Sequence, residues 1–225
     1  MNTRGSTLPL AALAAVTGAL ALMFLYAPTE GLQGEVQRIF YIHVPAAWIS
    51  FLAFFVVAVA SVLLLSKRDL RYDRIAAAAA EAGLVFTTIM MTTGPIWGRR
   101  VWGVWWVWDA RLTSSLVLWL IYVGYLLFRT TTPPGQRRAR LSAVIGIVGA
   151  VNVPVVYFSV FWWRTLHPLP TVLNPEGQLL PAEMRVTLYL SLLAFLLVFA
   201  SFVVLRLRIE DTRVRLTALE EALRA

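Results

Sequence analysis

Six long apolar segments constrain the fold of this chain more than any other feature. The chain has 225 residues, of which 59% are hydrophobic and only 14% are charged. A helical apolar run of about 20 residues matches the hydrocarbon core of a bilayer, and a helix satisfies its own backbone hydrogen bonds there. We therefore predict an all-α integral membrane protein. Its six transmembrane helices are expected at residues 8–26, 44–65, 75–96, 112–128, 141–161 and 186–205.

The positions of arginine and lysine predict the orientation of these helices. Fourteen of the 20 basic residues fall on the side that carries both termini, and six fall on the other side. Because basic residues concentrate in cytoplasmic loops, both termini are predicted to be cytoplasmic. The outer loops are then residues 27–43, 97–111 and 162–185. The net charge of +8 follows from this topology, so contact with membrane lipid and not with nucleic acid is expected.

Two regions are predicted along the chain. Residues 1–205 form the six-helix transmembrane domain. Its first apolar run is longer than the 7–15 residues of a signal-peptide core, which favours a retained signal anchor over a cleaved signal peptide. Residues 206–225 form a cytoplasmic amphipathic tail, whose apolar face suits either the bundle or membrane surface or a docking partner. That face consists of Ile209, Leu216, Leu219 and Leu223.

Two of the predicted spans contain residues that disfavour a helix, and one span contains an acidic residue. Gly94 and Pro95 are expected to end the third span, and Asn152 with Pro154 is expected to interrupt the fifth. Glu81 is the one acid well inside a span. An intramembrane carboxylate is a functional candidate, but Glu81 is near enough to the cytoplasmic end for a structural pairing role as well.

The middle outer loop is rich in tryptophan and arginine. Residues 97–113 read WGRRVWGVWWVWDARLT and hold five of the nine tryptophans. A membrane-interface aromatic belt explains one or two tryptophans at a helix end, not five. Aromatic faces edged with cations suit a large planar anion. The candidate binding residues are Trp97, Arg99, Arg100, Trp102, Trp105, Trp106, Trp108, Asp109 and Arg111. For Asp109, a helix N-cap role is the alternative to a ligand-facing one.

The two histidines of the chain, His43 and His167, both fall in predicted outer loops. Each is flanked by aromatic residues. Two neutral imidazoles from separate loops can bind one iron from opposite sides of a porphyrin. The chain has no cysteine, which excludes thioether attachment and thiolate ligands. We therefore predict non-covalent haem b with His43 and His167 as axial iron ligands, the tryptophans as its bed and the arginines at its propionates.

Three motifs resemble those of one family. The segment WGVWWVWDARLT (102–113) resembles the tryptophan-rich WWD signature of membrane haem-handling proteins. The segments YIHVPAAW (41–48) and WWRTLH (162–167) are similar to the histidine segments of the cytochrome c maturation family CcmC, or haem exporter protein C. The resemblance extends over nearly the whole chain. One departure is the stiff Pro168-Leu169-Pro170 run directly after His167.

The resemblance implies a function in c-type cytochrome biogenesis. A CcmC-type protein binds haem at the outer, periplasmic face of the bacterial cytoplasmic (inner) membrane. It delivers this haem to the haem chaperone CcmE, and the subunits CcmA, CcmB and CcmD assist. The chain is then a haem-binding and delivery subunit and not an enzyme. The alternatives are a haem-translocating permease subunit of an ABC-type complex, a membrane redox cytochrome and a scaffold without ligand.

Overall fold

The computed structural model describes residues 7–168 and 180–224, and its long elements there are all helices. They are α1 (Thr7–Leu25), α2 (Phe40–Lys67), α3 (Leu70–Val101), α4 (Ala110–Thr131), α5 (Gln136–Trp162) and α6 (Ala182–Arg224), with a short 3-10 helix η2 (Glu35–Ile39) before α2. Six helices in these ranges are long and apolar enough to cross a membrane. The predicted all-α, six-span fold class is confirmed to that extent.

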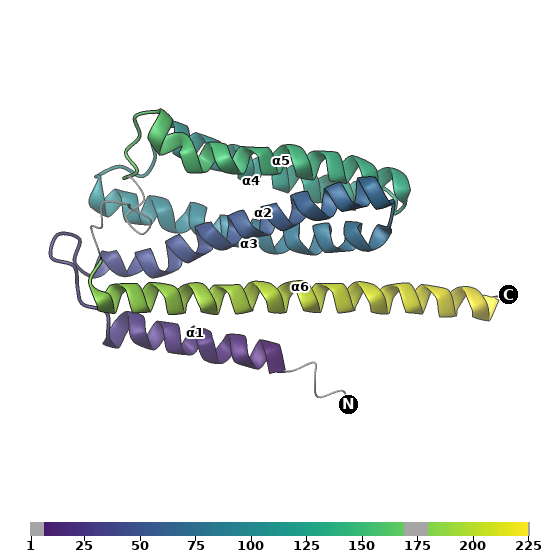
Figure 1. The fold of residues 1–225 in the computed structure, drawn as a ribbon, viewed down its shortest axis with the longest axis horizontal. Coiled ribbons are helices and arrows are strands. Elements are labelled where there is room, and N and C mark those ends of the chain that lie inside the picture. Colours follow the sequence, from purple (N-terminus) through teal and green to yellow (C-terminus); the bar gives the residue numbers. More distant parts are fainter. Residues whose placement is uncertain (1–6, 169–179, 225) are drawn as a thin grey trace.

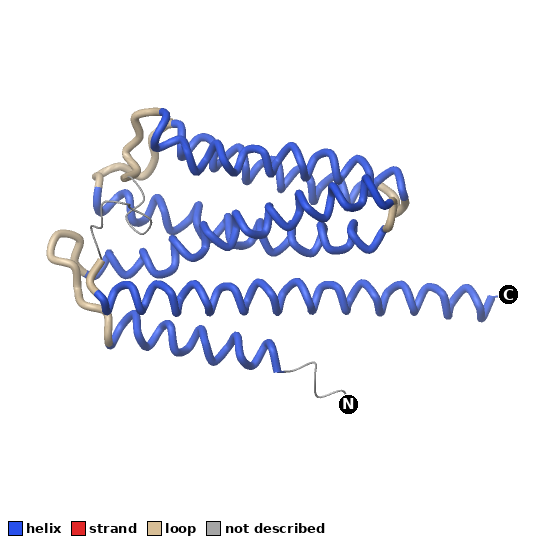
Figure 2. The backbone as a smooth tube through the Cα atoms, in the orientation of Figure 1, coloured by secondary structure: helices blue, strands red, loops and turns tan. Residues whose placement is uncertain are grey.

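The six helices form one bundle around α2. Helix α2 contacts α3, α5 and α6, while α4 packs on α3 and α5. Helix α1 lies along α6 at the edge of the bundle (Figure 1). The connecting loops lie at the two ends of the bundle (Figure 2), so successive helices run antiparallel. The segments that follow α1, α3 and α5 therefore share one end, and those that follow α2 and α4 share the other.

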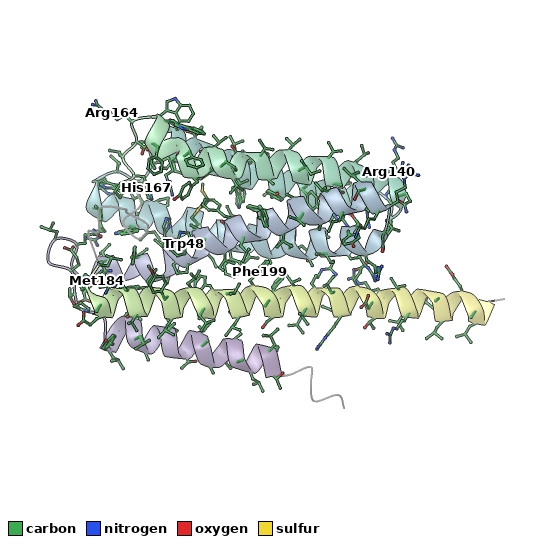
Figure 3. All side chains as sticks on the ribbon, in the orientation of Figure 1. Trp48, Arg140, Arg164, His167, Met184 and Phe199 are labelled. Atoms are coloured by element: carbon green, nitrogen blue, oxygen red, sulfur yellow. The ribbon has the colours of Figure 1, made fainter. Side chains whose placement is uncertain are left out.

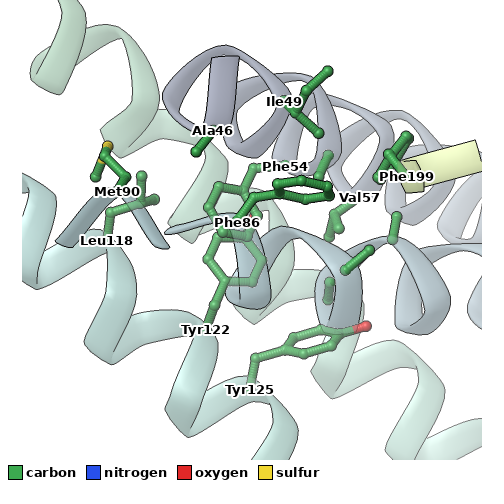
Figure 4. Close-up of a cluster of buried hydrophobic side chains, with 14 of the residues drawn as sticks. Ala46, Ile49, Phe54, Val57, Phe86, Met90, Leu118, Tyr122, Tyr125 and Phe199 are labelled. Carbon is green, nitrogen blue, oxygen red and sulfur yellow. The ribbon is translucent and has the colours of Figure 1, made fainter. Parts of the chain in front are cut away.

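The centre of the bundle is filled by aromatic and small side chains. Phe54 of α2 stacks on Tyr122 of α4 with ring centroids 3.7 Å apart, and both side chains are fully buried (Figure 4). The hydroxyl of Tyr122 donates to the Gly146 carbonyl oxygen of α5. Gly83 of α3 makes room for this stack, because a Cβ there would lie 2.8 Å from Phe54 Cε1. Small residues allow close helix packing where no hydrophobic effect drives helices together.

Ion pairs join the helices toward the end opposite the tryptophan-rich stretch. Arg129 of α4 donates to both carboxylate oxygens of Asp73 of α3, at 2.6 and 2.9 Å. Glu81 of α3 accepts from Arg206 of α6 at 2.6 Å. Glu81 thus pairs α3 with α6, which supports the structural role among the two that its sequence position left open. Paired charges are the form in which ionisable groups persist within membrane spans.

Two predicted interruptions were wrong. Helix α3 continues through Gly94 and Pro95 to Val101, and α5 continues through Asn152 and Pro154 to Trp162. A proline strains the residue before it partly through that residue's Cβ, and Gly94 has none. Helix α3 ends instead at Val101, with Trp102 as its C-cap, and Gly103 follows with a φ of 77°, the left-handed conformation that favours glycine after a helix. The first five residues of the predicted loop 97–111 are therefore helical.

Two other boundaries also differ from the expected spans. Helix α2 begins at Phe40, so His43 lies on a helix and not in a loop. The tail after residue 205 is helical as predicted, but it directly continues α6. Its apolar face does not rest on the bundle, since Ile209 is 50% exposed and Leu223 is 87% exposed. Apolar periodicity locates a helix but not the residue at which packing and caps end it.

Candidate functional site

A cavity of about 370 Å³ opens at the end of the bundle that carries the tryptophan-rich stretch. It lies between α2, α3, α4 and α5, and the segments after α3 and α5 cover part of it. Both histidines line it. Figure 3 places His167 and Trp48, which also lines the cavity, well away from Arg140 at the opposite end. Its volume is within the range of pockets that bury drug-sized ligands.

His43 is held by α3. Its Nδ1 lies 3.0 Å from the hydroxyl oxygen of Thr93. That hydroxyl donates its own hydrogen to the Ile89 carbonyl oxygen at 2.7 Å, so the hydrogen shared with His43 must come from Nδ1. The Nε2 of His43 consequently carries a free lone pair. Gly94 packs directly beside the ring, because a Cβ there would lie 3.1 Å from His43 Cε1.

His167 has the same tautomer by a different route. Its Nδ1 lies 2.9 Å from the carbonyl oxygen of Pro168, which can only accept a hydrogen bond. The Nε2 of His167 therefore also carries a free lone pair. Burial, and to a smaller extent the nearby charge of Arg111, lower the pKa of His167 to about 4. The ring is neutral at pH 7, which is the form that binds a metal.

Each histidine packs against a tryptophan of the stretch. The rings of His43 and Trp97 lie edge to face with centroids 5.8 Å apart, and the rings of Trp102 and His167 lie 6.2 Å apart. Trp102 folds back over Gly98 of α3, where a Cβ would lie 3.1 Å from its ring. The tryptophans that line the cavity are Trp48, Trp97, Trp102, Trp105 and Trp106. The stretch therefore surrounds both imidazoles with aromatic surface.

Of the other predicted binding residues, some line the cavity and some lie outside it. Trp108 is 75% exposed and contacts Trp106 edge to face, outside the cavity lining. Arg99 donates to the Gly103 carbonyl oxygen, and both Arg99 and Arg100 are exposed and absent from the lining. Among the described lining residues, the charged side chain is that of Arg111. The cavity is therefore electrostatically suited to an anion.

Asp109 is a helix N-cap, as its sequence position predicted. Its Oδ1 accepts from the Leu112 amide at 2.9 Å and caps α4. Its Oδ2 accepts from the Leu166 amide at 3.1 Å. This second bond connects the start of α4 to the residue before His167. Asp109 does not itself line the cavity, so it acts on the site through the segment that it holds.

Sequence reasoning missed several residues of the site. Met90, Met91, Gly94 and Tyr157 line the cavity, and Thr93 orients His43. Gln33 of the first loop also lines it and accepts a hydrogen bond from the Trp97 indole at 2.8 Å. None of these residues carries a motif of its own. Their roles depend on how the helices and the first loop pack against one another, which periodicity within a single helix does not reveal.

The bond between Trp97 and Gln33 gives a testable prediction. Trp97→Phe is expected to lower the free energy of unfolding by about 1 kcal/mol, because it removes a partly buried hydrogen bond. Thermal unfolding in detergent, followed by circular dichroism, measures this. Gln33→Met removes the same bond from its other side. The double variant is expected to be no less stable than the less stable single variant, whereas strictly additive losses would contradict a shared bond.

The sequence matches known proteins over most of its length. The family model described as Heme exporter protein C (CcmC) matches residues 2–221. The chain is 40% identical to the Heme exporter protein C of Bradyrhizobium diazoefficiens over 213 residues, which are 92% of this chain and 81% of that protein. It is 39% identical to the Heme exporter protein C of Escherichia coli K12 over 185 residues, which are 82% of this chain and 74% of that protein. A mitochondrial protein of Marchantia polymorpha, named as ccmC-like and for cytochrome c biosynthesis, is 37% identical over 84% of this chain and 80% of its own length. The chain is therefore a member of the Heme exporter protein C family.

Proposed function

We propose that this chain binds haem as a cargo at one end of its bundle and delivers it to the haem chaperone CcmE during c-type cytochrome biogenesis. The observation that carries the proposal is the arrangement of the histidines. Both line one cavity, and both have Nδ1 engaged as a donor and Nε2 free. Two neutral imidazoles with free Nε2 atoms match the axial ligands of haem iron. The names of the related proteins agree with this cargo.

The other groups on the lining fit the rest of a haem molecule. Aromatic walls suit the porphyrin face, and the propionates need donors. Arg111 is half-buried; it donates one hydrogen bond to the Val156 carbonyl oxygen at 3.4 Å, but among the described residues no carboxylate lies within 4.0 Å of it to balance its charge. The indole Nε1 of Trp106 is buried without a partner there. A buried donor without a partner and a partly buried cation without an opposite charge are both costly, so a carboxylate of the cargo would stabilise both groups.

The core below the cavity favours delivery over translocation through this chain. Phe54, Leu118, Tyr122 and Tyr125 are fully buried, and they belong to the core cluster shown in Figure 4. Transporter folds are typically built around broken helices near mid-membrane. Helices α3 and α5 are continuous. A permease path along the bundle axis would require this aromatic stack to open.

Location and partners complete the proposal. The end with fewer basic residues is the outer one, so the cavity faces the periplasm and both termini face the cytoplasm of a bacterial inner membrane. Membership of this family places the chain in a Ccm system. We propose CcmE as the acceptor and CcmA, CcmB and CcmD as the assisting subunits. No nucleophile is required of this chain, which holds haem for chemistry performed by the acceptor.

The orientation can be tested because the chain has no cysteine. Leu32→Cys places a thiol at a residue that is 97% exposed in the loop after α1. Gln136→Cys places one at the exposed start of α5. A membrane-impermeant maleimide is expected to label Leu32→Cys in cells with a permeabilised outer membrane, and Gln136→Cys only after the inner membrane is lysed. The reverse pattern would contradict the orientation.

Delivery and translocation can be separated by two measurements. In cells that contain the full set of Ccm proteins, haem staining of purified CcmE is expected only when this chain is present. In vesicles that contain this chain without the ATP-driven partners, no haem is expected to cross the membrane. Uptake of haem by such vesicles would favour the permease function. Haem-free CcmE in the presence of this chain would contradict delivery.

A further inference from the structure

We propose that the two histidines have different roles, with His43 the fixed ligand and His167 the exchangeable one. We further propose that Asp109 is the positioning residue that holds His167 in the binding position. The inference rests on the proposed function, because it concerns the order in which the ligands release the haem. It follows from a difference in how the two imidazoles are anchored.

The anchors of His43 come from another helix. His43 lies in the first turns of α2, and its ring bonds to Thr93 of α3, 50 residues away in the sequence. Gly94 and Trp97 of α3 pack against the same ring. Helices α2 and α3 form the most extensive helix pair of the bundle. Moving the His43 ring would therefore require separating two packed helices.

The hydrogen bonds of His167 are local, and the ring that packs against it, Trp102, itself lies in the non-helical stretch after α3. His167 lies in the non-helical segment after α5, and its Nδ1 bonds to the carbonyl oxygen of the next residue. The Thr165 hydroxyl bonds to the His167 carbonyl within the same segment. These bonds move with the segment and do not fix it to the bundle. Segments with few contacts to neighbouring elements and exposed hydrogen bonds open at low free-energy cost.

The bond between Asp109 and Leu166 fastens this segment to α4. Among the described residues of the segment, 163–168, the Trp163 amide bonds to Ser159 at the end of α5, and the Asp109 bond is the one that reaches an element other than α5. The two carboxylate oxygens of Asp109 accept different hydrogen bonds: Oδ1 accepts the bond that caps α4, and Oδ2 accepts the bond from the segment. An asparagine can keep the cap with its one oxygen, but its amide NH₂ group cannot accept from Leu166. Asp109→Asn therefore weakens the attachment of the segment and leaves the helix start intact.

The handover is then a ligand exchange on the His167 side. The bond from His167 Nε2 to the iron breaks and its electron pair leaves with the ring. A donor atom of the acceptor supplies the replacing pair, while the bond from His43 persists until the second exchange. The step changes neither the oxidation state nor the proton count of this chain. Trp163, Arg164 and Leu166 of the same segment are exposed, which leaves the segment accessible to an acceptor.

Cyanide binding to the purified, ferric haem-loaded protein tests this order. Cyanide displaces one axial histidine, so its binding rate reports how readily a ligand leaves. Asp109→Asn is expected to bind cyanide about tenfold faster than the wild type, the factor for loss of a bond of about 1.4 kcal/mol. Thr93→Val, which removes the bond to His43, is expected to accelerate cyanide binding less than Asp109→Asn does, because the packing of α2 on α3 still holds the His43 ring. An unchanged thermal midpoint for Asp109→Asn will show that the helix cap survives. Acceleration by Thr93→Val alone would overturn the proposal.

Single histidine variants give a second, independent readout. Transfer of haem to excess apomyoglobin is expected to be at least tenfold faster from His43→Ala than from His167→Ala, because the remaining ligand of the former lies on the weakly held segment. Equal or reversed rates would overturn the difference in roles. If both variants instead keep the wild-type bis-histidine spectrum, the ligand assignment of the proposed function fails. The two failures are therefore distinguishable.

Discussion

The variant in which alanine replaces both His43 and His167 is expected to show no bis-histidine absorption bands after haem loading. These are the only two histidines in the chain, and it has no cysteine. The other possible donors on the described lining are Met90, Met91 and Tyr157, which give different spectra. Loss of one outer-shell partner of a metal ligand costs up to about 100-fold in affinity. Loss of both ligands is expected to cost more than about 100-fold.

The control for this experiment lies at the same end of the bundle. Arg164 is exposed and does not line the cavity, and Figure 3 shows it at the same end of the bundle as His167. Arg164→Ala is expected to retain the bands and the affinity of the wild type. Visible spectra and haem titration of both proteins in mild detergent provide the comparison. Unchanged bis-histidine bands in the double alanine variant would remove the basis of the proposed function.

Much of the fold could be predicted because membrane physics restricts the choices. Runs of about 20 apolar residues have few alternatives to a transmembrane helix, and all six predicted spans lie within observed helices, apart from residue 26 of the first. Helix ends were less predictable. The long α6 and the continuous α3 show why, since polar residues after 205 and Pro95 do not by themselves end a helix. Caps and tertiary contacts decide the end.

The site was predictable where its residues are rare or conspicuous. Two histidines in the entire chain, both beside aromatic residues, directed attention to one end, and the structure brings both into one cavity. The arginines were harder to place, because Arg99 and Arg100 follow the turn of α3 toward solvent whereas Arg111 turns inward. Sequence spacing shows which way a side chain points only when the residues at which each helix begins and ends are known. Thr93 and Gly94 needed the contact between α2 and α3, which no single segment encodes.

Gly94→Leu is expected to weaken haem binding about 100-fold and to produce a spectrum with one histidine displaced. A Cβ at this position would already lie 3.1 Å from His43 Cε1 and 3.7 Å from Nδ1. The further carbons of leucine extend from that Cβ toward the ring or into the cavity that Gly94 lines. A shift of about 1 Å in a binding group can cost about 100-fold. The His43 bond to Thr93 is 3.0 Å long, so such a shift would also break it.

Two comparisons isolate the effect of side-chain size beside His43. Gly94→Ala introduces the same Cβ before Pro95 and therefore the same local strain. However, the His43 ring would have to move by only a few tenths of an ångström to accommodate it. The haem affinity of this variant is expected to lie within about tenfold of the wild-type affinity, because strain of about 1.4 kcal/mol corresponds to a tenfold loss. Gly124→Leu places an equal side chain on α4 where nothing lies within 4 Å, and wild-type affinity is expected. If Gly94→Leu binds haem as tightly as Gly94→Ala, the ring of His43 does not need the position that α3 gives it, and its role as the fixed ligand is lost.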